Sequence, residues 1–122
     1  MLYYNMKNIN EPKELTNIEV RKEKSSKLQI KYKDKTPIIC IIPKDVIIDN
    51  KTSYNFMLSN SIDIKYLAKI VEKKVKFKKV IDFFIMTENG QLLKEYNTIG
   101  NISEAHKDED GFLYLYFKIP FC

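Results

Sequence analysis

The chain has 122 residues and a mass of 14.5 kDa, enough for one hydrophobic core with no room for a second. Hydrophobic residues make up 44% of the chain and charged residues 30%, which excludes a disordered chain and is ordinary for a soluble globular fold. The net charge of +5 is unevenly distributed, because residues 1–79 carry +9 and residues 80–122 carry −4. A basic face of this kind suits nucleic acid, an anionic membrane or an acidic peptide, although a solvated lysine-rich surface explains it as well.

The N-terminal part of the chain contains one predicted helix with a weak apolar face. "TNIE", residues 16–19, has the form of a capping box, in which Thr16 accepts a hydrogen bond at the helix start and Glu19 reaches back. The following "VRKEKSSKLQIKY" is polar and has only scattered apolar positions. We therefore expect a helix that lies on a surface and buries little.

Two strands are predicted next. "TPIICII", residues 36–42, is a continuous apolar run that is rich in β-branched residues and begins near a proline, which is typical of a strand buried on both faces. Cys40, inside this run, is predicted to be a small buried core residue. "YNFML", residues 54–58, is predicted to be a second strand, and the turn-like "DNKTS" precedes it.

The clearest helix follows the second strand. Ser59, Asn60 and Ser61 are candidate N-caps, and Asp63 suits the positive end of the helix dipole. Lysines close the last turn, where cations are favoured. Apolar residues at helical spacing predict one buried face, formed by Ile64, Leu67, Ile70, Val71 and Val75.

The C-terminal third is predicted to be mostly strand. "VIDFFIM", residues 80–86, is a third strand that ends in the turn residues "ENG". "QLL" is a very short fourth strand, and "NTIGNISEA" is a single irregular helical turn. Residues 112–119 form the last strand, which is apolar on both faces and is therefore predicted to be central.

This order of elements predicts the fold class. Helix, strand, strand, helix, strand, strand, turn and strand is the pattern of a β-grasp, or ubiquitin-like, sheet, an α+β fold. Its first and last strands can lie side by side in the middle, which fits the two runs that are apolar on both faces, "PIICII" and "FLYLYF". We predict a single ubiquitin-like domain over residues 1–122, with an N-terminal helical extension over residues 1–32 and a β-grasp core over residues 33–122.

The acidic run in "HKDEDGFLYLYF", residues 106–117, is either a cation loop or a turn before a buried strand. With Asp108 and Asp110 at positions 3 and 5 of a calcium loop, Gly111 falls correctly at position 6. Phe117, however, stands where the loop needs its bidentate glutamate. We therefore predict a solvated turn and no metal site.

No catalytic machinery is visible in the sequence. His106 is the only histidine, and a histidine in such a context is more typical of a turn or a helix end than of a catalytic base. No nucleophile elbow is present, and three glycines are too few for a phosphate-cradling loop. Cys40 and Cys122 lack the spacing of a zinc site, and no apolar stretch is long enough to span a membrane. We predict a cytoplasmic protein that is not an enzyme, with no catalytic residues and no cofactor.

The segment "HKDEDGFLY" is very similar to a segment of the ubiquitin-like autophagy modifiers, the family of the GABA-receptor-associated protein and of microtubule-associated light chain three. "KYKDKTPIIC" resembles the first strand of that family, and "YNFMLSNSIDIKYLAKIVEKKVKF" resembles its second strand and central helix. "TIGNISEAHKDEDGFLYLYF" resembles its last helical turn and last strand. The resemblance covers roughly residues 18–119.

The resemblance implies a β-grasp with two extra N-terminal helices and a function without catalysis. Members of the family are attached through a terminal glycine to phosphatidylethanolamine on autophagic membranes, where they recruit proteins that carry a short aromatic-x-x-aliphatic motif. The motif adds itself as a strand to the edge of the second strand, and two pockets select its side chains. The resemblance therefore also implies the autophagy conjugation enzymes as partners, and a peripheral position on autophagic or other organelle membranes.

The resemblance assigns the two pockets, and the charged residues beside them, to particular positions of this chain. Each apolar position is also consistent with an ordinary core residue. The aromatic pocket is matched to Leu28, Pro37, Ile39, Met57 and Phe112. The aliphatic pocket is matched to Phe56, Leu58, Ile62, Leu67 and Ile70. Contacts to acids flanking the motif are matched to Lys35 and Lys74.

The chain also departs from the family pattern. Lys24 and Asn55 alter the charges at the rim of the aromatic pocket, and Ser59 replaces a proline after the second strand. The chain stops at Cys122 and has no glycine after Gly111, so we predict that it is not conjugated to lipid by the usual route.

The basic residues also suggest an alternative function. Lysines 65 to 79 suggest a basic surface-binding module for an anionic membrane or nucleic acid. Nucleic acid is not expected as a partner, because these lysines lack interleaved exposed aromatic residues and an arginine for base reading.

Overall fold

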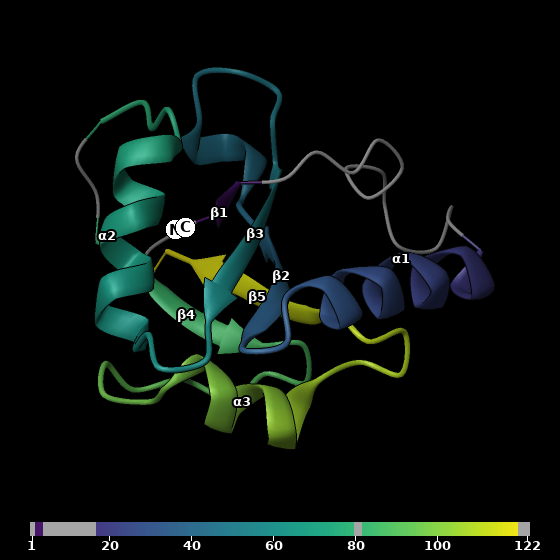
Figure 1. Ribbon diagram of the computed structural model, residues 1–122. Helices are drawn as coiled ribbons and strands as arrows, with labels where there is room; N and C mark the ends of the chain where they lie inside the picture. The colour runs from purple at the N-terminus through teal and green to yellow at the C-terminus, as the bar shows by residue number, and fades with distance from the viewer. Residues whose placement is uncertain (1, 4–16, 80–81, 120–122) are drawn as a thin grey trace.

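The structure is a computed structural model, and it describes residues 2–3, 17–79 and 82–119 (Figure 1). Three α-helices and five strands make up most of the described chain. The helices are α1 Ile18–Lys31, α2 Ile64–Lys74 and α3 Ile99–His106. The strands are β1 Leu2–Tyr3, β2 Lys35–Ile41, β3 Ser53–Ser59, β4 Phe84–Thr87 and β5 Leu113–Lys118.

The strands form one mixed sheet in the order β1-β3-β2-β5-β4. β2 and β5 are parallel neighbours, with Ile38 opposite Leu113 and Ile41 opposite Tyr116. All other pairings in the sheet are antiparallel. The prediction that the two runs apolar on both faces lie side by side in the middle is confirmed, and it holds because only central strands have both faces covered.

Helices cover the two faces of the sheet, α2 on one side and α1 on the other (Figure 1). Alternate residues of each strand therefore enter two separate clusters. The larger cluster contains the α2 side of the sheet, with Ile38, Phe56 and Leu115. The smaller cluster contains Ile39, Phe112 and Tyr114, beneath the α1 residue Leu28 and beside Ile41 and Tyr116.

Helix α1 buries little, as predicted, since Arg21 and Ser25 are its only buried residues. Its N-cap is Asn17, whose side chain accepts the backbone N–H of Glu19 at 2.7 Å. The capping box predicted from Thr16 is therefore wrong for the helix start, and Thr16 itself lies outside the described residues. Asparagine caps a helix at least as well as threonine, so the cap moves by one residue.

Helix α2 has the predicted buried face. Its N-cap is Asp63, whose carboxylate accepts the backbone N–H of Tyr66 at 2.9 Å, while Ser59, Asn60 and Ser61 precede the helix without capping it. The residues that the periodicity placed on one face are all buried, namely Ile64, Leu67, Ile70, Val71 and Val75.

Several boundaries differ from the sequence-based expectation. The third predicted strand is shorter, β4 at Phe84–Thr87, and residues 80–81 lie outside the described residues. "QLL" forms only an isolated bridge between Leu92 and Met86. Helix α3 is a regular helix of 8 residues rather than one irregular turn, because the Thr98 side chain caps it by accepting the Asn101 N–H.

Strand β1 was not expected from the sequence at all. Its two residues pair with β3, so the start of the chain belongs to the sheet. The division into a helical extension over residues 1–32 and a core over residues 33–122 stays a prediction. None of the described helices is long and apolar enough to cross a membrane.

Candidate functional site

The candidate site is centred on β3, whose two edges differ. Along its inner edge β3 is paired with β2 from Ser59, opposite Lys35, to Ser53, opposite Ile41. Along its outer edge β3 meets β1, with Met57 opposite Leu2 and Phe56 opposite Tyr3. An edge strand offers a row of backbone donors and acceptors on its outer side, which is what an added strand uses.

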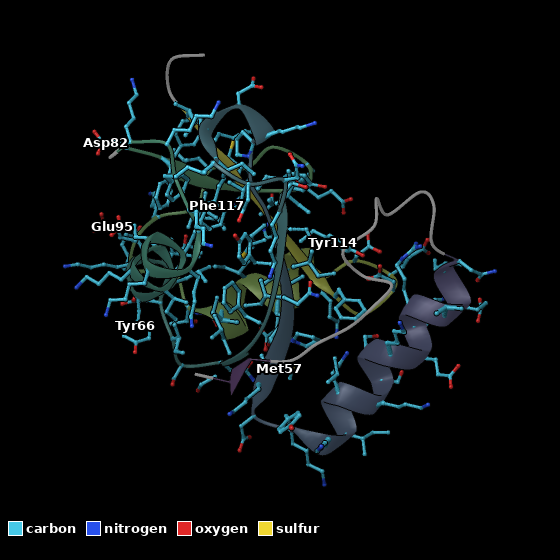
Figure 2. The ribbon with its side chains drawn as sticks, turned by 90° about the horizontal axis from the view of Figure 1, so that it is seen from above. Met57, Tyr66, Asp82, Glu95, Tyr114 and Phe117 are labelled. Carbon is cyan, nitrogen blue, oxygen red and sulfur yellow. The ribbon has the colours of Figure 1, made fainter. Side chains whose placement is uncertain are left out.

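The residues matched to the aromatic pocket all lie on the α1 side of the sheet. Pro37 and Met57 are directly opposite one another on β2 and β3. Ile39, Phe112 and Leu28 belong to the smaller apolar cluster. Figure 2 labels Met57 on β3, and Tyr114 points toward α1 in the same view. The structure thus gathers these five residues on one face, where Met57 and Phe112 are fully buried and Leu28 is half-buried.

The residues matched to the aliphatic pocket lie on the opposite face, against α2. Phe56, Leu58 and Leu67 are fully buried within the larger cluster, and Ile70 is buried beside them. Ile62, just before the helix, packs against the same cluster and is half-buried. In this conformation four of the five are core residues, and Ile62 is the half-buried one.

The two matched lysines stand near the ends of these elements. Lys35 is the first residue of β2, half-buried, with its ammonium 5.8 Å from the centroid of the Tyr32 ring. Lys74 is the last residue of α2 and is exposed. The lysines of the segment from 65 to 79 are all exposed: Lys65, Lys69, Lys73, Lys74, Lys76, Lys78 and Lys79.

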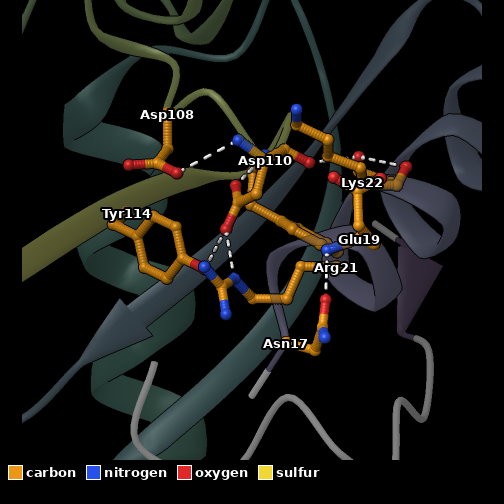
Figure 3. Close-up of polar contacts among 9 residues, drawn as sticks. Asn17, Glu19, Arg21, Lys22, Asp108, Asp110 and Tyr114 are labelled. Carbon is orange, nitrogen blue, oxygen red and sulfur yellow. Dashed lines mark hydrogen bonds and ion pairs between the residues drawn. The ribbon is translucent and has the colours of Figure 1, made fainter. Parts of the chain in front are cut away.

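The acidic turn before β5 is not fully solvated, so one part of that prediction is wrong. Glu109 is exposed and Asp108 half-buried, but Asp110 has no exposed surface. Its carboxylate receives the Arg21 Nε at 2.8 Å, the Tyr114 hydroxyl at 2.6 Å and the Phe112 backbone N–H at 2.9 Å (Figure 3). A buried carboxylate persists when it is paired and hydrogen-bonded in this way.

This network fixes α1 to the start of β5. Besides the Arg21 ion pair, the Ser25 hydroxyl donates to the Asp110 carbonyl at 2.5 Å, and the Gln29 amide donates to the Gly111 carbonyl at 3.3 Å. Three successive turns of α1 therefore contact the same turn, and α1 carries Leu28 over Phe112. The turn thus holds α1 against the face of the sheet that carries Phe112.

The same contacts change the chemistry of Tyr114. Burial raises the pKa of its phenol, and the hydrogen bond to Asp110 raises it further, because both favour the neutral form. One feature of the sequence could have indicated this network. Arg21 is the only arginine in a chain that otherwise uses lysine, and a planar guanidinium suits a buried carboxylate better than an ammonium does.

Cys40 and His106 lie where the sequence predicts them. Cys40 is fully buried, as predicted, and burial raises the pKa of its thiol. His106 is the last residue of α3, the helix-end position that was expected. Within residues 2–3, 17–79 and 82–119, no three metal-ligating side chains lie together. Cys122 lies outside the described residues.

A mixed sheet with parallel central strands, a helix crossing one face and a further N-terminal helix on the other defines a ubiquitin-like protein. The model of the family described as "Autophagy protein Atg8 ubiquitin like" matches residues 20–119, and the chain belongs to this family. Autophagy-related protein 8 of Emericella nidulans is 28% identical over 102 residues, which cover 82% of this chain and 84% of that protein. Autophagy-related protein 8 of Neurospora crassa is likewise 28% identical, over 82% of each chain.

Solved structures agree on the fold. The crystal structure of Trypanosoma brucei ATG8 superimposes with a TM-score of 0.75 at 23% identity, over 94% of this chain and 95% of that one. Plasmodium falciparum Atg8, in complex with a Plasmodium falciparum Atg3 peptide, superimposes with a TM-score of 0.72 at 19% identity, over 88% of this chain and 96% of that one. The α+β, ubiquitin-like fold predicted from the sequence is confirmed.

Proposed function

We propose that this Atg8-family protein is a peptide-binding adaptor that docks aromatic-x-x-aliphatic motifs along the outer edge of β3. The observation that carries the proposal is the position of β3 beside the edge strand β1, with Phe56 and Leu58 of the larger cluster on its α2 face and the buried Met57 on its α1 face. Met57 belongs to the α1 side, and Phe56, its neighbour, belongs to the α2 side. A strand added here presents alternate side chains to both sides.

Backbone hydrogen bonds and pocket contacts have different roles in this proposal. The backbone of β3 supplies affinity that is independent of the peptide sequence. The aromatic residue of the motif is selected beside Met57 and Leu28, and the aliphatic residue beside Ile62. Lys35 and Lys74 attract acidic residues that flank the motif. The chain acts by binding and not by catalysis.

The proposed partners are motif-bearing autophagy proteins and the conjugation enzymes of the pathway. The complex of the Plasmodium falciparum relative with an Atg3 peptide supports this second class. We propose a cytoplasmic protein that reaches autophagic membranes peripherally. Nucleic acid is not among the proposed partners, since the exposed lysines of α2 and the segment after it come without arginine.

The test is a nuclear magnetic resonance titration of the full chain with an acidic peptide of about twelve residues that carries one motif. We expect amide shift changes along Ser53–Ser59 and little change along Phe84–Thr87, the strand at the other side of the sheet. A control peptide with both motif anchors replaced by alanine should bind more weakly by roughly 1–3 kcal/mol or more, the usual cost of losing buried anchors. Shift changes concentrated on β4, with β3 unaffected, would contradict the proposal.

A further inference from the structure

The start of the chain occupies the edge at which the proposed ligand binds. Leu2 lies opposite Met57 and Tyr3 lies opposite Phe56, in antiparallel pairing on the outer side of β3. Met57 and Phe56 are the two β3 residues that were matched to the aromatic and the aliphatic pocket. In Figure 1 β1 lies directly beside β3, at the end of the sheet order.

The two strands cannot use this edge at the same time. The inner side of β3 is committed to β2 over all seven of its residues. The one residue of Phe56 and Met57 whose backbone N–H and C=O point outward can therefore serve one added strand, either β1 or a peptide. Among the described residues, β1 is the strand that takes this place.

We propose that β1 is a built-in competitor that closes the peptide-docking edge until a ligand displaces it. This inference rests on the proposed function and names the regulation of the same site. A strand of two residues forms one hydrogen-bonded and one non-hydrogen-bonded pair, so it is held weakly and can be displaced. Its effect is nevertheless sizeable, because a tethered segment is present at a high effective concentration.

The chain after β1 is long enough to permit this displacement. Residues 4–16 separate Tyr3 from Asn17, the N-cap of α1. A connection of thirteen residues can span about 40 Å when extended, so β1 can leave the edge while α1 remains fixed by the Arg21–Asp110 pair.

The test variant replaces both residues of β1 with proline, Leu2→Pro with Tyr3→Pro, which removes the backbone donors that pair with β3. The matched control, Leu2→Val with Tyr3→Phe, keeps these donors and the strand preference. Binding of a labelled motif peptide to the full chain is measured by fluorescence anisotropy. A site that is open about one tenth of the time binds tenfold more weakly than an open one, so we expect about tenfold tighter binding for the proline variant. The control should bind like the wild type.

Hydrogen exchange of the Phe56 and Met57 amides, in the absence of peptide, gives a readout that does not depend on the ligand. The one of these two amides that points outward should exchange at least several-fold faster in the proline variant than in the wild type and the control. If exchange responds in this way but the peptide binds all three proteins equally, β1 is no competitor and the proposal fails while the proposed function stands. If the peptide binds none of the three, the proposed function fails and the competition falls with it. Equal exchange in all three proteins would show that β1 does not cover the edge.

Discussion

The Arg21 Nε and the Asp110 Oδ2 lie 2.8 Å apart, although the two residues are 89 positions apart in the sequence. Both side chains are buried, so the pair is shielded from solvent and from salt. It joins a helix that has almost no apolar face to the turn before β5. α1 is therefore held by a few polar contacts where other surface helices rely on apolar burial.

Removing Arg21 should therefore be costly. Arg21→Ala leaves the Asp110 carboxylate buried without its cation, and we expect it to lower the free energy of unfolding by roughly 3–5 kcal/mol. The control is Lys27→Ala, which breaks the exposed Lys27–Glu23 pair at 3.0 Å and should cost less than about 1 kcal/mol. Urea unfolding followed by circular dichroism measures both. Equal stabilities for the two variants would show that the buried pair does not hold α1.

Gly111 should tolerate a side chain less well than Gly90. Both glycines have positive φ, +92° and +90°, so alanine is strained at either position by roughly 1–2 kcal/mol. Only at Gly111 would the added Cβ collide with α1, at Ser25 Oγ and, 2.9 Å away, at Ser25 Cβ, whereas at Gly90 its nearest neighbour is 4.0 Å away. We expect Gly111→Ala to be the more destabilising by a further 1–3 kcal/mol or so, the usual cost of overpacking. Similar melting temperatures for the two variants would contradict the close seating of α1 on this turn.

The Tyr114 phenol predicts a loss of stability at alkaline pH. Its pKa in the folded protein is raised above the ordinary value of about 10, by burial first and then by its hydrogen bond to Asp110. The unfolded chain releases this proton near pH 10 while the folded protein keeps it, so the stabilisation is present below about pH 10 and is lost as the pH rises further. The limiting slope for one such group is about 1.4 kcal/mol per pH unit.

Unfolding in urea at several pH values between about 9 and 11.5 measures this slope. Tyr114→Phe should have a shallower alkaline loss than the wild type, although it is about 1 kcal/mol less stable at neutral pH because it lacks the hydroxyl donor to Asp110. Tyr96→Phe, at an exposed tyrosine, is the control and should follow the wild type. The buried Cys40 thiol is the same in all three proteins and so does not affect the comparison. If the free energy of unfolding falls equally with pH in the wild type and Tyr114→Phe, the alkaline loss of stability does not come from Tyr114.

Charge reversal tests the two lysines of the proposed docking site. Lys35→Glu and Lys74→Glu should each weaken binding of an acidic motif peptide about two- to fivefold at low salt, with smaller effects at high salt, because exposed charges are screened. Lys118→Glu is the control, on β5 and separated from β3 by β2. Titration calorimetry at two salt concentrations measures the affinities. An equal loss for Lys118→Glu would show that net charge, rather than these two positions, attracts the peptide.

The sequence by itself determined the order of the elements and the centre of the sheet. "PIICII" and "FLYLYF" are apolar on both faces, and only a central strand has both of its faces buried. Six residues of each run were therefore enough to predict that the two strands are neighbours in the middle of the sheet. The buried face of α2 followed from helical spacing in the same way. These features are local, since a period of two or of 3.6 residues is visible within one element.

Only the tertiary structure decided where Asp110 and residues 2–3 lie and what they contact. The sequence predicts Asp110 in solvent with its acidic neighbours, because its cationic partner is not close to it in the sequence. Its partner Arg21 comes from the other end of the domain, and the close approach at Gly111 is what admits α1 to this place. The pairing of Leu2 with Met57 is likewise non-local, and two residues are too few to show a period. Contacts between distant segments depend on how the whole chain packs around its core, so a pattern within one segment cannot predict them.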